Sequence, residues 1–78
     1  GDWKEKKMKN FKVAIGYGEN VQSVNEFQTV DTVEATTAYD AAVEIWNGLE
    51  QSEEQDIIFQ VHPEDSNEIE YFVEGDFR

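Results

Sequence analysis

His62 is the only histidine in the chain, and Glu64 and Asp65 follow it closely across Pro63. An imidazole beside carboxylates can act as a general base or contribute to a metal site. A histidine at the end of a strand, next to a turn, gives the same local pattern without any chemical role. We interpret His62 as a structural residue of this second kind.

The other motifs that could support catalysis are incomplete. The chain contains no cysteine, and Ser23, Ser52 and Ser66 lie in polar segments with no histidine placed to activate them. The segment GYGEN at 16–20 does not continue as a dinucleotide-binding fingerprint, because Val21 stands where the third glycine is required. These patterns therefore predict neither a nucleophile nor a phosphate-binding loop.

Carboxylates are abundant, so no single pair stands out as an acid–base couple. The acidic segments 51–56 and 63–70 supply oxygen ligands, but they lack the spacing that folds a loop around calcium. We expect no enzyme, no cofactor and no dedicated metal site.

Hydrophobic periodicity predicts four strands and one helix in the order ββαββ. Apolar side chains alternate in 11–18, less regularly in 24–35, and again in 56–63 and 68–74, as they do in half-buried strands. An apolar stripe with helical spacing begins after Thr37. The pattern predicts an α+β domain with a four-stranded, mainly antiparallel sheet and one helix packed on one face.

Two details of these elements can be expected from local sequence. Thr37 can cap the helix, with Asp40 three residues on, and the apolar stripe of 38–49 fades at 50–53, where the helix should end. The imperfect alternation within 24–35 predicts a β-bulge or a change of register in the second strand.

The alternation also assigns each side chain to a face of the sheet. The predicted core consists of Val13, Ile15, Phe27, Val33, Ala42, Ile45, Trp46, Leu49, Ile57, Phe59, Val61, Ile69, Tyr71 and Val73. The second face then receives Glu68, Glu70, Phe72 and Glu74 from the last strand and Ile58 from the third. We expect this face to be mostly polar, with Ile58 and Phe72 either as isolated exposed residues or as a small contact patch.

The ends of the chain differ from its body. Residues 1–10 are interpreted as a tag remnant or a translated leader, flexible, with natural translation starting at Met8. Residues 11–78 are interpreted as a single α+β domain, because a chain of 78 residues can build one hydrophobic core. No apolar run approaches the length of a membrane span, so a cytoplasmic protein is expected.

The distribution of charge is the most unusual property of the sequence. Five of the six basic residues lie within residues 4–12 and the sixth is Arg78, so the segment 13–77 holds 16 of the 18 acids and no lysine or arginine. With 38% hydrophobic and 13% aromatic residues, the chain is expected to fold despite this charge. Its sign disfavours direct binding of nucleic acid.

Three classes of function remain open. The favoured one is a small non-enzymatic binding protein that docks on a basic protein surface, such as that of a nucleic-acid-binding protein, with DNA mimicry as the extreme case. The alternative is a structural or regulatory subunit that oligomerises through the open sheet face, its acidity serving solubility only. An enzyme acting through His62 is the third. Short acidic chains without an evident active site are typical of accessory and inhibitor proteins of phages and mobile elements, and we expect a monomer or weak homodimer.

The expected partner-binding residues are acids of the second half of the chain, with one aromatic side chain among them as an apolar anchor. They are Glu53, Glu54, Asp56, Glu64, Asp65, Glu68, Glu70, Phe72 and Glu74.

The charge pattern predicts that salt stabilises the fold. Compaction brings the carboxylates of 13–77 together without neighbouring cations, and salt screens repulsion beyond a Debye length of about 10 Å at 0.1 M. The melting temperature should therefore rise as NaCl is added. A melting temperature that falls steadily with NaCl would contradict this expectation.

Overall fold

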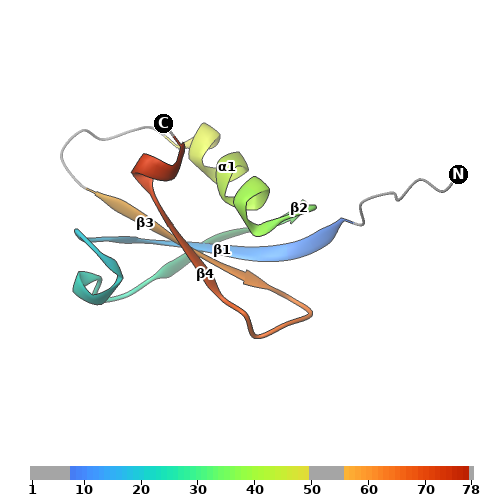
Figure 1. Cartoon of the computed structure of the whole chain (residues 1–78), viewed down its shortest axis with the longest axis horizontal. Helices are drawn as coiled ribbons and strands as arrows, with labels where there is room; N and C mark the ends of the chain where they lie inside the picture. The colour runs from blue at the N-terminus through green and yellow to red at the C-terminus, as the bar shows by residue number, and fades with distance from the viewer. Residues whose placement is uncertain (1–7, 50–55, 78) are drawn as a thin grey trace, which may run out of the picture.

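The computed structural model describes residues 8–49 and 56–77, which form a four-stranded sheet with one helix on one face (Figure 1). The strands are β1 (Lys9–Tyr17), β2 (Gln28–Ala35), β3 (Ile57–Pro63) and β4 (Glu70–Val73). Helix α1 (Ala38–Gly48) follows β2, and two short 3-10 helices, η1 (Val21–Ser23) and η2 (Glu74–Phe77), follow β1 and β4. The predicted α+β fold with the order ββαββ is confirmed.

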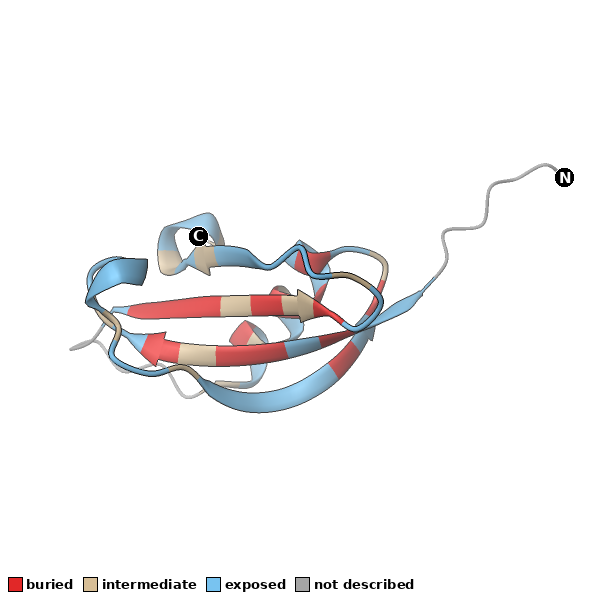
Figure 2. Ribbon diagram, turned by 90° about the horizontal axis from the view of Figure 1, so that it is seen from below, coloured by how far each residue is buried: buried red, intermediate tan, exposed pale blue. Residues whose placement is uncertain are grey.

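The sheet is open and its strands lie in the order β2-β1-β3-β4. All three neighbouring pairs are antiparallel, so β1 and β3 are central while β2 and β4 form the edges. Figure 2 is seen from below and presents the second face of the sheet, opposite α1.

Local sequence explains both ends of α1. Thr37 Oγ1 accepts a hydrogen bond from the Asp40 backbone N–H at 3.1 Å, and Thr36 Oγ1 donates to the Asp40 carboxylate at 2.9 Å, so the predicted cap is confirmed. The helix ends at Gly48, earlier than expected, and Leu49 is extended. Glycine is a weak helix former, which accounts for the early end.

Strand β1 begins earlier than expected, and β2 is irregular. Lys9 and Asn10, assigned to the leader, form the first residues of β1, whereas residues 1–7 lie outside the described part of the chain. Val13 lies opposite Asp31 but Ala14 lies opposite Thr29, so one extra residue of β2 bulges out between them. The predicted bulge is confirmed.

The main core lies between α1 and the sheet. Its buried members are Phe11, Val13, Val33, Ala35, Ala38, Ala41, Ala42, Trp46, Ile57, Phe59 and Val61. Ile15, Ile45, Leu49, Phe72 and Phe77 pack against them. The prediction is confirmed for the helix and for most positions in β1 and β3, but Phe27 lies outside this cluster.

The predicted orientation of β4 is wrong. Its register places Phe72 opposite Phe59, which faces α1, and places Tyr71 opposite Gln60. Phe72 therefore points toward the helix, while Ile69, Tyr71 and Val73, expected in the core, are 42%, 41% and 43% exposed.

Aromatic packing and hydrogen bonding explain this orientation. Phe72 joins the rings of Tyr39 and Phe77, with centroid distances of 5.8 and 6.2 Å. Tyr71 needs a polar partner for its hydroxyl group, and on the second face Gln60 Nε2 donates to it at 3.2 Å. Phe72 has no polar group, which suits the core beneath α1, where no polar side chain of the described residues is buried.

The second face is more apolar than predicted. Ile58 is 1% exposed, and its partner Gly16 on β1 is covered by the connection between β1 and β2, which folds back over this end of the sheet. Val24 and Phe27 of that connection lie directly on Gly16, and Phe27 also contacts the Tyr71 ring at a centroid distance of 5.8 Å. The connection between β1 and β2 therefore packs on the sheet and covers one end of its second face.

Truncation of Trp46 tests the core beneath α1. Trp46 is 8% exposed and stacks on Phe77, with the two centroids 5.5 Å apart. Trp46→Ala should lower the free energy of unfolding by about 3 to 5 kcal/mol, measured by urea denaturation. Glu44→Ala, on the exposed side of the same helix, should change it by less than about 0.5 kcal/mol. Equal effects of the two substitutions would contradict this packing.

A second substitution tests the packing on the second face. A Cβ atom at Gly16 would overlap Val24 and approach Phe27 Cδ1 to 3.0 Å, so Gly16→Ala should destabilise the fold by about 1 to 3 kcal/mol. Gly48 is the matched control, because a Cβ atom there meets nothing within 4 Å. Gly48→Ala should be neutral or stabilising by up to about 1 kcal/mol, and a tolerated Gly16→Ala would show that the connection does not pack on β1.

Candidate functional site

Carboxylates occupy the margins of the structure. The two central strands, β1 and β3, contain no acid, and every acid among the described residues is exposed except Glu74, which is half-buried. The described acids lie on the edge strands, on the outer side of α1 and in the connections. Lys9 and Lys12 are the only lysines in 8–49 and 56–77, and these ranges contain no arginine.

The predicted partner-binding acids fall into two groups at opposite ends of β3. Asp56 precedes this strand, whereas Glu64 and Asp65 follow it. The strand has 7 residues and therefore separates the groups by roughly 20 Å. The predicted partner-binding acids are thus divided between the two ends of β3, and Glu53 and Glu54 lie outside the described residues.

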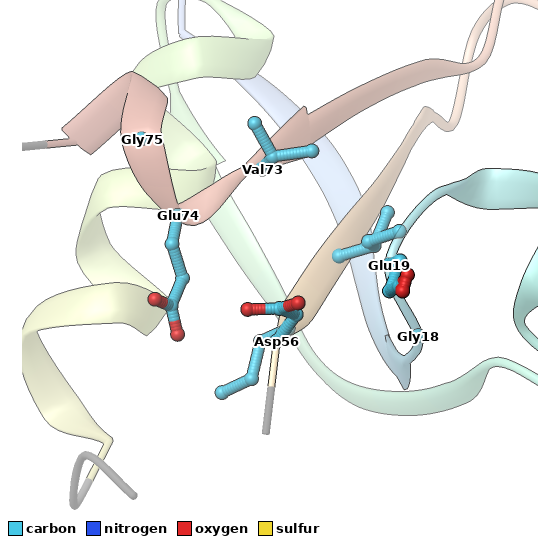
Figure 3. Close-up of a pocket in the computed structure, with 8 residues that line it drawn as sticks. Gly18, Glu19, Asp56, Val73, Glu74 and Gly75 are labelled. Carbon is cyan, nitrogen blue, oxygen red and sulfur yellow. The ribbon is translucent and has the colours of Figure 1, made fainter. Parts of the chain in front are cut away.

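The first group surrounds a hollow of about 400 Å³ between the start of β3 and the end of β4. Asp56, Glu74 and Glu19 line it together with the apolar side chains of Ile58 and Val73. Figure 3 shows Asp56 lying between Glu74 on one side and Glu19 on the other. Among the described residues, no three carboxylate or imidazole groups come close enough to hold a metal ion.

The second group lies around the β3–β4 connection. Asp65 forms an exposed ion pair with Lys9 at 3.6 Å, which contributes little stability in water. Glu68 and Glu70 line a shallow hollow beside Thr36 and Thr37, at the N-terminus of α1. They therefore lie on the helix side of β4, and their predicted place on the second face is wrong.

The contacts of Phe72 and His62, two further candidate residues, are those of structural residues. Phe72 packs against the core beneath α1, so its predicted place on the second face is wrong. His62 is half-buried, and its Nε2–H donates to the Ser66 carbonyl oxygen at 2.9 Å, which ties the end of β3 to the connection that follows it.

This orientation exposes three apolar residues that the sequence pattern had placed in the core. We call Ile69, Tyr71 and Val73 the β4 stripe: they occupy alternate positions, and Tyr71 and Val73 lie opposite Gln60 and Ile58 on the second face. One signal could have indicated this orientation. The three consecutive apolar residues 57–59 are typical of a strand covered on both faces, which requires apolar neighbours on the second face as well.

Comparison with known proteins identifies no family and no related structure for this chain. No protein-family model matches the chain, and no curated protein or solved structure is detectably similar to it. Among the described residues, no helix has the length and apolar character that crossing a bilayer requires.

The orientation of β4 can be tested with two substitutions in neighbouring positions. Phe72→Ala should lower the free energy of unfolding by about 2 to 3 kcal/mol, because this side chain packs against the core. Val73→Ala should cost less than about 1 kcal/mol, because much of its side chain is already in water. Urea denaturation measures both free energies of unfolding. A larger loss for Val73→Ala than for Phe72→Ala would show that Val73, rather than Phe72, faces the core.

Proposed function

We propose that this chain is a small acidic binding protein, rather than an enzyme, and that it docks on a basic protein surface along β4. One observation carries the proposal: the β4 stripe is exposed beside carboxylates of the same hairpin. Glu68 and Glu70 alternate with Ile69 and Tyr71 along the chain and lie on the other side of the strand. Protein interfaces commonly combine an apolar centre with a polar or charged rim.

Electrostatics favours a basic partner. The described residues contain two lysines, whereas acids lie on every margin of the structure. A basic partner would supply the positive charge that these margins lack. Complementary charge of this kind accelerates association and makes it sensitive to salt. The apolar stripe then contributes the contacts that resist dissociation.

The same charges disfavour association between copies through β4. The chain carries a net charge of −12, and pairing two β4 strands would bring Glu68 and Glu70 of one copy near the same residues of the other. Like charges facing each other across neighbouring strands are destabilising. We therefore favour a different, basic protein over a second copy.

Charge reversal at two different places tests whether binding depends on the acids beside β4 or only on the net charge of the chain. A partner captured from lysate and identified by mass spectrometry should bind the purified chain, with an affinity that falls at least about tenfold between 50 and 300 mM NaCl. Glu68→Lys combined with Glu70→Lys should abolish this binding. The matched control, Glu34→Lys with Glu44→Lys, changes the net charge equally on other elements and should retain most of it.

Two outcomes would contradict the proposal. If both double variants lose binding to the same extent, overall acidity rather than the β4 side attracts the partner. If no partner elutes with salt, acidity serves solubility only. Circular dichroism and urea denaturation of each variant establish that the fold is intact, since all four residues are exposed.

A further inference from the structure

We propose that the partner binds as an extended segment that adds to the sheet as a fifth strand, antiparallel to β4, and that this segment alternates basic and apolar residues. This inference rests on the proposed function and specifies the kind of partner. It follows from three features of β4: the direction of its backbone groups, the way its edge is protected, and the alternation of its side chains.

Two hydrogen bonds establish which backbone groups of β4 point outward. The Gly18 N–H donates to the Asp56 carbonyl at 3.1 Å, and the Glu64 N–H donates to the Asn10 carbonyl at 3.0 Å. In an antiparallel ladder, the N–H and C=O of one residue point to the same side, and this side alternates along the strand. The even-numbered residues of β3 therefore point toward β1, including Gln60.

The register then gives the direction for β4. Tyr71 and Val73 lie opposite Gln60 and Ile58, which point away from β4, so their own backbone groups point to the outer edge. The Val73 N–H confirms this direction, because it donates to the Asp76 carboxylate at 2.9 Å rather than to β3. Tyr71 thus presents both its N–H and its C=O at the edge of the sheet.

The other edge of the sheet is protected more fully. In β2 the outward N–H of Thr32 donates to the Asp31 carboxylate at 2.8 Å, in the middle of the strand, and Val30 bulges from it. Both devices hinder the addition of a strand. In β4 the comparable acid, Asp76, caps only the last residue, so the edge at Tyr71 remains available among the described residues.

The alternation of β4 determines which side chains an added strand requires. Residues directly opposite each other in an antiparallel pair project to the same face. A residue opposite Tyr71 would lie beside the β4 stripe and should be apolar, whereas the residues opposite Glu70 and Glu68 would project toward the helix side, where these two acids lie. Those two residues should be lysine or arginine, because charge complementarity favours them.

A defined probe tests this pattern. A peptide of about seven residues that alternates lysine and valine, with blocked ends, should bind at least about tenfold more tightly than a peptide of the same composition with its lysines and valines in separate blocks. Fluorescence anisotropy of labelled peptides measures both affinities. Val73→Ser combined with Ile69→Ser should remove most of the difference, because both side chains belong to the β4 stripe.

Methylation of the peptide backbone tests strand addition itself. In the antiparallel arrangement, the residue opposite Tyr71 directs its N–H and C=O toward β4, and this residue is a valine. N-methylation of the valines should therefore abolish the preference for the alternating peptide. N-methylation of the lysines, whose N–H groups point to solvent, is the matched control and should leave the preference within about threefold.

The outcomes separate this inference from the proposed function. If both peptides bind equally and with strong salt dependence, the acidic surface recruits cations but strand addition is wrong. If neither peptide binds at low salt, the proposed docking along β4 fails as well. If both methylated peptides retain the preference, the peptide binds by side chains alone, and the inference is overturned. Light scattering that shows dimers without peptide would assign the edge to a second copy instead.

Discussion

The absence of cations from the body of the chain governs how this sequence can fold. A carboxylate can be buried only beside a compensating charge or several hydrogen-bond donors, and residues 13–77 contain no lysine or arginine. Acids are therefore excluded from the interior, and β1 and β3 contain none. Apolar residues fill the helix side of these central strands, and Ala14 and Ile58 are buried on the second face, while the carboxylates collect on the edges, on the outer side of α1 and in the connections.

This constraint explains which parts of the structure could be predicted. The order of elements, the Thr37 cap and the bulge in β2 depend on local patterns, and all three are visible in the sequence. The inward positions of β1, β3 and α1 were also predictable, because each element has one dominant apolar face. These elements needed no knowledge of the contacts made by the rest of the chain.

The orientation of β4 could not be predicted in the same way, and most of the candidate site depends on it. Tyr71 and Phe72 are neighbours of similar size, so alternation alone allows either to face the helix. The choice depends on Phe77, which enters the core from η2, and on the hydroxyl partner that Gln60 provides for Tyr71. Both are tertiary contacts. The candidate acids among the described residues are exposed as expected, apart from the half-buried Glu74, but Glu68 and Glu70 were assigned to the wrong face because their place follows from this choice.

The difference between the two edges has a consequence for stoichiometry. A sheet with two equally receptive edges can accept a strand on one side and offer a strand on the other, which permits growth into fibres. In this chain Asp31 and the bulge at Val30 obstruct β2, whereas Asp76 caps only the end of β4. Growth would stop after a single addition, so the architecture favours a closed one-to-one complex over an open polymer.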